Sequence, residues 1–355
     1  MKVSSRFVVL ALGLLASGAL AQPAASGPYK VLTTAKVGGL GGYDYVAADS
    51  DGRRLYIPRG APANHITVYD LDSLKLVGEI ADTQSVHGAA VDPKTHHGFS
   101  SSKPVVMWDS RTLATIKSIP VEGNPDGIFF DAFTSRIFVL SHRAPNVTVI
   151  DSKDGAIVGT IDLGGAPEQA QSDGQGKIFI DIEDKGTVAV VDAKALKVTA
   201  TYDLGNKDLT PAGLALDAKN HILFACCRNP ATCVVLNSDD GKILATLPIG
   251  AGTDSAAFNA ATMEAFSSQG DGTLTVIKEN SPTSFAVEQN VATKAGAKTC
   301  TLDEKTGHIL LITSDRAPAP APLAPAPGEA PAAPKKGGPR SVMVPDSFTI
   351  LTVGR

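Results

Sequence analysis

The chain has 355 residues, a formal net charge of -4 at pH 7 and a hydrophobic content of 43%. A net charge this close to zero does not by itself indicate nucleic acid or another strongly charged partner, and the apolar content suffices for a large buried core. No long apolar segment follows the N-terminal region, so we expect no transmembrane segment.

The first 21 residues have the pattern of a signal peptide. Lys2 and Arg6 precede an apolar run over residues 7–15, and Ala19-Leu20-Ala21 forms an A-x-A cleavage site. The apolar run is shorter than the ~20 residues that a spanning helix needs. We therefore expect cleavage after Ala21 and a periplasmic or secreted protein.

The rest of the chain reads as imperfect copies of one unit, which is clearest at residues 125–166. This unit contains the short apolar runs GIFF, RIFVL, VTVID and AIVGTIDL, separated by turn-forming residues. Short β-branched and aromatic runs between turns are typical of strands and too short for typical helices. One copy therefore predicts a four-stranded antiparallel meander.

A polar residue ends the first strand of each copy and marks the register. These markers are Asp49, Asp92, Asp131, Asp173, Asp217, Asn259 and Asp303. Seven copies of a four-stranded unit with a period of about 40 residues predict an all-β, seven-bladed β-propeller. We expect the blades to begin near residues 43, 86, 125, 167, 211, 253 and 297.

The seventh copy lacks its outer strand, and the segment 29–39 near the N-terminus resembles one. We expect this segment to pair with the C-terminal blade and close the ring, so that the propeller covers residues 29–355. A Pro/Ala-rich insertion at 316–346 interrupts the last blade. Its alternating Ala/Pro part, residues 317–334, predicts either a stiff polyproline arm or a disordered loop. Its role is either that of a tolerated surface insertion or that of a partner-binding arm.

The strands VTVID and VAVVD, each followed by an outer strand of the type A-x-V-x-x-I and by glycines, resemble the YVTN-type (YncE-like) repeats of exported β-propellers. IPRG, LSHR and ITSD stand where that family usually has VTN. The resemblance covers nearly all of residues 29–355. It implies a seven-bladed propeller and a binding or scaffold role at the cell envelope, with DNA binding attributed to some members. The family supplies no catalytic motif, and a fold alone does not determine function.

The residues five positions before the markers stand at the start of the innermost strands. They are Asp44, His87, Asp126, Glu168, Ala212, Asp254 and Lys298. Sevenfold geometry directs all of them toward the channel mouth on the upper face, where Lys298 would offset part of the acidic charge. Carboxylates with a histidine suit Ca²⁺, Mn²⁺ or Zn²⁺, so the metal-ligand candidates are Asp44, His87, Asp126, Glu168 and Asp254. The alternative is a set of solvated loop residues or caps.

The turns between second and third strands carry a basic residue in six of the seven copies. The ligand-binding candidates among them are Arg59, Arg143, Arg228 and Arg316. Such arginines bind a carboxylate or phosphate of a small anionic ligand, or else they pair with acids of neighbouring blades. His142 lies in the same loops and is placed to join His87. Nucleic acid is less favoured, because single-strand binding needs aromatic platforms and only Tyr43 and Tyr45 stand near this mouth.

Four cysteines occur in a chain that we expect to reach an oxidising compartment. Cys226 or Cys227 is placed to bridge Cys233 across a hairpin, or all three remain buried thiols. Cys300 stands alone on another copy. No C-x-x-C motif is present, which argues against thiol redox chemistry.

The sequence lacks G-x-S-x-G, a P-loop, a dinucleotide fingerprint, H-E-x-x-H and C-x-x-C-H. We therefore expect a monomeric, exported binding or scaffold protein that recognises a small anionic ligand or an envelope protein at the upper channel mouth. The alternative is a metal-dependent, lactonase-like hydrolase. In that case the acidic cluster holds Ca²⁺ or Zn²⁺, and a carboxylate or His87 acts as the base.

Overall fold

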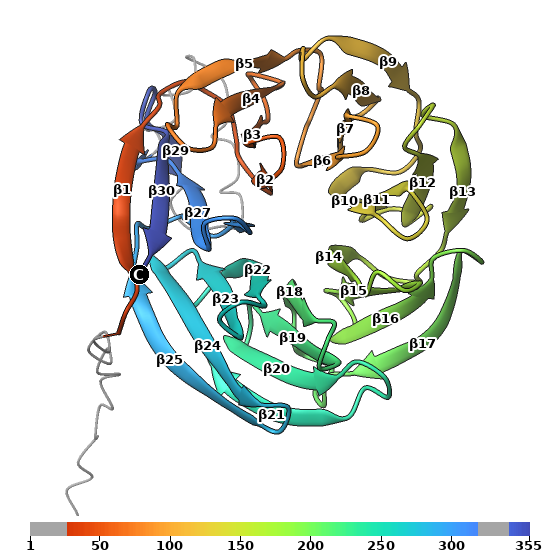
Figure 1. The fold of residues 1–355 in the computed structure, drawn as a ribbon, viewed down its shortest axis with the longest axis vertical. Coiled ribbons are helices and arrows are strands. Elements are labelled where there is room, and N and C mark those ends of the chain that lie inside the picture. The colour runs from red at the N-terminus through yellow and green to blue at the C-terminus, as the bar shows by residue number, and fades with distance from the viewer. Residues whose placement is uncertain (1–26, 319–340) are drawn as a thin grey trace, which may run out of the picture.

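The computed structural model describes residues 27–318 and 341–355. Within these ranges the protein is all-β, and seven four-stranded sheets, the blades, form a ring (Figure 1). The prediction of a seven-bladed β-propeller is confirmed. The described residues contain no helix, so none of them forms a helical membrane span.

Each blade has an innermost, a second, a third and an outer strand, counted from the axis outwards. The innermost strands are β2 (Ala47–Asp49), β6 (Ala89–Asp92), β10 (Pro125–Asp131), β14 (Pro167–Ser172), β18 (Pro211–Asp217), β22 (Thr253–Asn259) and β26 (Cys300–Asp303). The second strands are β3 (Arg54–Arg59), β7 (His97–Ser100), β11 (Arg136–Ser141), β15 (Lys177–Ile182), β19 (Ile222–Cys227), β23 (Glu264–Gln269) and β27 (His308–Thr313). The third strands are β4 (His65–Asp70), β8 (Val105–Asp109), β12 (Val147–Asp151), β16 (Thr187–Asp192), β20 (Thr232–Asn237), β24 (Thr273–Ser281) and β30 (Thr349–Gly354). The outer strands are β5 (Leu76–Ile80), β9 (Thr115–Ile119), β13 (Ile157–Ile161), β17 (Lys197–Asp203), β21 (Ile243–Pro248), β25 (Ser284–Ala292) and β1 (Lys30–Lys36).

The polar markers end the innermost strands because their side chains cap the turn that follows. Six of the seven innermost strands end at the marker, whereas β14 ends one residue earlier, at Ser172. Asp131 shows the physical reason, since its Oδ2 accepts a hydrogen bond from the backbone N–H of Thr134 at 2.9 Å. Asp and Asn make such local turns readily, so the marker sets the lower end of each blade. The upper face is the one at which the innermost strands begin.

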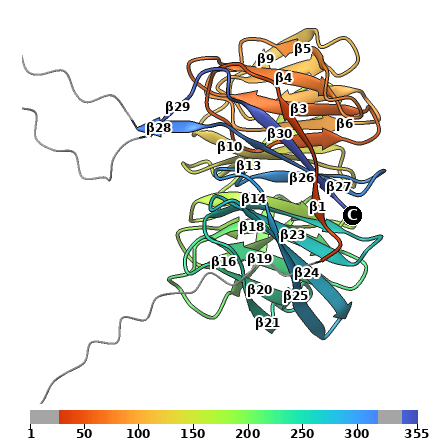
Figure 2. The same ribbon diagram turned by 90° about the vertical axis from the view of Figure 1, so that its left-hand side faces the viewer.

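The last blade takes strands from both ends of the described chain. β1 is hydrogen-bonded antiparallel to β30, with Lys30 opposite Gly354 and Lys36 opposite Thr349. Between β27 and β30 a short hairpin of β28 (Arg316–Pro318) and β29 (Ser341–Met343) extends away from the ring (Figure 2). Most of the predicted Ala/Pro arm, residues 319–334, and the predicted signal peptide, residues 1–21, lie outside the described residues.

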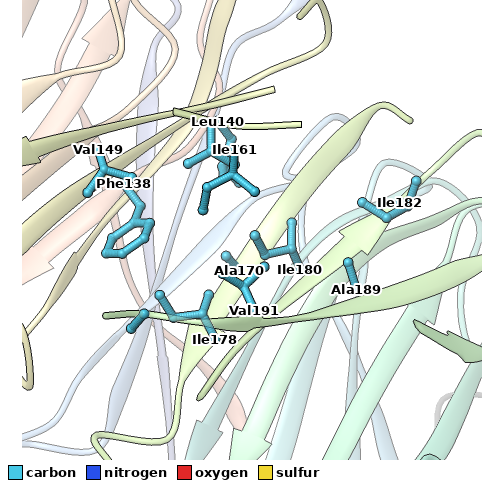
Figure 3. Close-up of a cluster of buried hydrophobic side chains, with 12 residues drawn as sticks. Phe138, Leu140, Val149, Ile161, Ala170, Ile178, Ile180, Ile182, Ala189 and Val191 are labelled. Atoms are coloured by element: carbon cyan, nitrogen blue, oxygen red, sulfur yellow. The ribbon is translucent and has the colours of Figure 1, made fainter. Parts of the chain in front are cut away.

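Apolar side chains that alternate along each strand hold neighbouring blades together. In β15, Ile178 and Ile180 pack against Phe138 and Leu140 of the third blade (Figure 3), while Phe179 packs against the fifth blade. Successive strand residues point to opposite faces, so one strand contributes to two interfaces. The described residues form seven such clusters, one at each interface between blades. Full burial of one large apolar side chain contributes roughly 1.5–3 kcal/mol, which makes these clusters the main source of stability.

All four cysteines are buried and free. Cys226 on β19 lies directly opposite Cys233 on β20, and their Sγ atoms are 3.0 Å apart. Cys227 packs on the other side of its strand, between the fourth and fifth blades, and Cys300 lies in another interface. Of the two pairings left open by the sequence, the fold therefore brings together Cys226 and Cys233.

Asp181 of β15 interrupts the apolar pattern between the fourth and fifth blades. Its side chain is fully buried, and neither carboxyl oxygen has a hydrogen-bond partner among the described residues. Burial, reinforced by the nearby Cys226 and Glu168, raises the pKa of Asp181 well above its usual range. The carboxyl is therefore protonated in the folded protein at neutral pH, whereas the unfolded chain ionises it, and this difference costs stability.

Replacing Asp181 with valine should stabilise the protein by about 1–3 kcal/mol at pH 7.5, because it removes a buried and unpaired polar group. In the unfolded chain Asp181 ionises above a pKa of ~3.9, whereas in the folded protein it stays protonated, so its burial destabilises the fold more as the pH rises above that value. The stability gained by Asp181→Val should therefore be smaller at pH 4 than at pH 7.5. Urea unfolding at both pH values measures this difference. A variant less stable than the natural protein at pH 7.5 would contradict the assignment of an unpaired carboxyl.

Candidate functional site

The candidate site lies on the upper face, where the innermost strands begin close to the axis (Figure 1). Six of the predicted site residues occupy this position in six different blades. They are Asp44, His87, Asp126, Glu168, Asp254 and Lys298. The structure brings all six into one network of contacts, although residues 44 and 298 lie 254 positions apart in the sequence.

Eight side chains form a closed ring at this mouth, in which carboxylates alternate with bases. In order around the axis, this mouth ring consists of Asp44, His87, Asp126, His142, Glu168, Arg228, Asp254 and Lys298. Each member contacts the next, and Lys298 Nζ closes the ring at 3.3 Å from Asp44 Oδ1. Four acids face four bases, so the repulsion expected among converging carboxylates is compensated within the protein.

In one half of the mouth ring the bases are histidines. His87 Nδ1 lies 2.8 Å from Asp44 Oδ2 and 3.1 Å from Asp126 Oδ1. His142 Nε2 lies 3.0 Å from Asp126 Oδ2 and 3.4 Å from Glu168 Oε1. A single imidazole nitrogen thus faces two carboxylates in each case, an arrangement that favours the protonated ring.

In the other half the bases are permanent cations. Arg228 pairs with Glu168 at 3.2 Å and also contacts Asp254 and Glu183. Lys298 contacts Asp254 as well as Asp44. The fifth blade has an alanine, Ala212, at the start of its innermost strand and so contributes no charged side chain from that position. Its member of the mouth ring is instead Arg228, which directly follows β19 of the same blade.

The protonation states follow from these contacts. Hydrogen bonds to Asp126 and Glu168 outweigh partial burial and raise the pKa of His142 to about 10. The hydrogen bond to Asp44 likewise raises the pKa of His87. Burial alone would raise the pKa of Glu168, but His142, Arg228 and Tyr45 together lower it to about 2. His142 is therefore cationic at neutral pH, and the contacts of His87 also favour its protonated form. Burial raises the pKa of Asp254, although Lys298 and Arg228 oppose this effect.

Two groups at the mouth were not assigned to the site by sequence reasoning. Tyr45 of the first blade extends across the mouth and donates a hydrogen bond from its hydroxyl to Glu168 Oε2 of the fourth blade, at 2.7 Å. Burial, together with the charge of Glu168, raises the pKa of Tyr45 well above its usual range, so this hydroxyl keeps its proton. Glu183 adds a further carboxylate to Arg228. In the sequence, the only feature that points to a role of Tyr45 at the mouth is its position directly after Asp44.

The predicted basic ring does not form as a ring. Arg228 is the one arginine of the four candidates that joins the mouth ring among the described residues. Arg59 is only 2% exposed, and its guanidinium carbon lies 3.4 Å from the centre of the Phe348 ring. Arg316 donates from Nε to Ser341 Oγ at 2.9 Å within the β28–β29 hairpin, and Arg143 is exposed. Arg59 thus packs in the interior, Arg316 belongs to the hairpin and Arg143 lies at the surface. Binding of an anion by these three arginines stays a prediction.

The histidine half of the mouth ring has the composition and spacing of a metal site. Asp44, His87 and Asp126 form one three-residue group, and Asp126, His142 and Glu168 form a second. In each group the potential ligand atoms lie within 4.8 Å of one another. Ligands around one divalent ion at bond lengths of about 2.0–2.5 Å have separations of this size.

The stability of the protein should fall as the pH rises through the range in which His142 loses its proton. A histidine whose folded-state pKa is raised stabilises the fold fully below its unfolded value of ~6.5, and this stabilisation is lost as the pH approaches 10. Thermal melting from pH 6 to 10 should therefore decline, and His142→Ala should flatten the decline. His221→Ala, which removes a histidine paired with Asp239 away from the mouth ring, is the control and should leave the slope unchanged. Equal slopes for the natural protein and His142→Ala would contradict the assigned role.

Comparison with known proteins relates this chain to the YncE proteins of Salmonella. No model of a protein family matches the chain. Two curated relatives, the uncharacterized proteins YncE of Salmonella typhi and of Salmonella typhimurium, are each 23% identical to it over 195 residues. The match covers 53% of this chain and 54% of each relative, so the chain spans about half the length of the curated relatives it matches.

The structure of U3-55K is similar to this fold with a TM-score of 0.66, over 91% of this chain and 98% of that one. At 11% sequence identity this likeness shows the fold alone. The similarity to YncE, taken together with the seven four-stranded blades, supports the identification of this chain as a YncE-like β-propeller protein.

Proposed function

We propose that this YncE-like propeller is an exported binding protein that takes a divalent cation at its upper channel mouth, with Asp44, His87 and Asp126 as ligands. The observation that carries the proposal is the close approach of two carboxylates and one imidazole, whose ligand atoms lie within 4.8 Å of one another. The neighbouring group with Glu168 is less suited, because Arg228 and Tyr45 already occupy that carboxylate. Export rests on the signal-peptide pattern of residues 1–21.

The chemistry of the donor set favours zinc or manganese over calcium. Imidazole is a good ligand for zinc and related ions, whereas calcium prefers six to eight oxygen ligands. A divalent cation would replace the proton that His87 now holds between Asp44 and Asp126, so the repulsion between the two carboxylates would stay compensated. An ion held by three side chains keeps a position open. A carboxylate or phosphate of a small anionic ligand is the group that would bind there.

The test is calorimetric titration of the chelator-treated, purified protein with Zn²⁺. One saturable site is expected, and binding should tighten from pH 6 to pH 8, because the imidazole must lose its proton before it binds the metal. His87→Ala and Asp126→Asn should each weaken binding by about 10- to 100-fold or more, whereas His221→Ala, the matched histidine control, should bind as the natural protein does.

Two results would overturn the proposal. One is the absence of saturable heat with Zn²⁺ and Mn²⁺ together with an unchanged melting temperature. The other is equal affinity in the natural protein and in His87→Ala. The melting temperature of each variant without metal separates a loss of ligand from a loss of fold.

A metal-dependent, lactonase-like hydrolase is the second candidate, since the same His-carboxylate group would hold its metal. Arg228 pairs with Glu168 and Asp254, which leaves Asp44 and Asp126 as the acids not paired with arginine. The hydrolase predicts Zn²⁺-dependent opening of a simple γ-lactone at pH 7.5 that is lost in Asp126→Asn. The binding proposal predicts metal uptake with no turnover above the rate in buffer, so a pH-stat assay distinguishes the two.

A further inference from the structure

Cys226 and Cys233 face each other across the hairpin of β19 and β20 in the fifth blade. The two strands pair in unbroken register along their whole length, and the two Sγ atoms are 3.0 Å apart. Directly opposite residues of an antiparallel pair have Cα atoms about 4.5–5.5 Å apart, which lies within the range of about 4.4–6.8 Å that disulfides span. The backbone is therefore already positioned for a covalent link between these two thiols.

The other two cysteines lie away from this pair. Successive strand residues point to opposite faces, so Cys227 packs between the fourth and fifth blades, whereas Cys226 and Cys233 pack between the fifth and sixth. Cys300 lies between the sixth and seventh blades, where its Sγ is 3.6 Å from Ser255 Oγ. The fold therefore favours one pairing among the four thiols.

Burial determines when the link between Cys226 and Cys233 forms. The two side chains are 1% and 0% exposed, and burial raises the pKa of Cys233 well above its usual range. The thiolate is the attacking species in disulfide exchange, so the folded hairpin reacts slowly. Because only seven positions separate the two cysteines, their strands can pair before the sixth blade covers them. Exchange therefore belongs to the folding stage, and the finished blade shields its product.

We propose that Cys226 and Cys233 are joined by a disulfide that forms during folding, by exchange with an oxidant that itself contains a disulfide. The thiolate of one cysteine attacks the oxidant R–S–S–R and releases one thiol, R–SH. The thiolate of the other cysteine then attacks this mixed disulfide and releases the second R–SH. The two cysteines lose their hydrogen atoms and gain one S–S bond, while the S–S bond of the oxidant is reduced to two thiols.

The disulfide closes the turn that carries Arg228 to the mouth ring. Arg228 follows Cys226 by two positions, and its backbone N–H donates to the carbonyl of Thr210 at 2.8 Å. Its Nε donates to the carbonyl of Thr253 at 3.2 Å, and its guanidinium pairs with Glu168 at the same distance. A cross-link at the base of the turn restricts the backbone from which these contacts are made. The disulfide is therefore a positioning element for the mouth ring as well as a link between two strands.

Mass spectrometry of the refolded protein tests the link. The purified protein is refolded without metal, either with a mixture of oxidised and reduced glutathione or with a phosphine reductant, and its remaining thiols are then blocked with N-ethylmaleimide in denaturant. Trypsin cuts after Arg228, so a disulfide joins the peptides 220–228 and 229–242. We expect joined peptides and two blocked thiols after refolding with glutathione, and separate peptides and four blocked thiols after refolding with reductant.

Two variants assign the link to one cysteine of the neighbouring pair. Cys226→Ala should release the two peptides from each other under both conditions. Cys227→Ala, the same substitution at the adjacent buried cysteine, is the matched control and should keep them joined after refolding with glutathione. Fragmentation of the joined peptides from the natural protein makes the same assignment without any substitution, so a variant that fails to fold leaves the test intact.

The two forms of the natural protein also test the effect on the turn. The reduced form should melt about 3–8 °C lower, because it lacks the cross-link that restricts the unfolded chain. Backbone amides of residues 228–231 should exchange hydrogen about tenfold faster in the reduced form. The equivalent turn of the third blade, residues 142–146, contains no cysteine and should exchange equally in both forms.

Four blocked thiols after refolding with glutathione, or joined peptides that persist in Cys226→Ala, would overturn the disulfide. Equal exchange of residues 228–231 in the two forms would overturn its positioning role. Neither result bears on Zn²⁺ uptake by Asp44, His87 and Asp126, because metal is absent throughout.

Discussion

Repulsion among carboxylates near the axis is the constraint on which the upper face depends. All innermost strands of a propeller begin at the same face, so an acid that recurs at the start of several strands is brought to the same place each time. Asp126, Glu168 and Asp254 are largely buried there, and buried charges of one sign are stable only with partners at contact distance. His142, Arg228 and the other bases of the mouth ring supply those partners.

The two halves of the mouth ring have different chemistry. Arg228 does not lose its proton under physiological conditions, and contact with Asp44 and Asp254 raises the pKa of Lys298 above its usual range despite burial. The bases of the other half are histidines, which bind a metal ion only after they lose a proton. The proposed cation site therefore lies in the histidine half of the mouth ring.

Much of the fold was predictable because it is encoded locally. Runs such as RIFVL and VTVID, with Asp131 ending the preceding strand, carry their strand length, direction and turn within a few residues. The candidate site was predictable only in part. Arg59 is the last residue of β3, whereas Arg228 comes directly after the last residue of β19, so the two arginines differ by one position in their repeats. Successive strand residues point to opposite faces, and Arg59 packs on Phe348 while Arg228 reaches the mouth ring. Grouping the basic residues by loop and not by exact register therefore misses this difference.

The sequence by itself determined the number of blades, the register of their strands and the residues that stand at the start of each innermost strand. It did so because a repeat places equivalent residues in equivalent positions. The tertiary structure alone decided which base meets which acid. These contacts join side chains of different blades, such as Lys298 with Asp44 and Tyr45 with Glu168. The local sequence pattern of one repeat does not contain the information that specifies a contact with another blade.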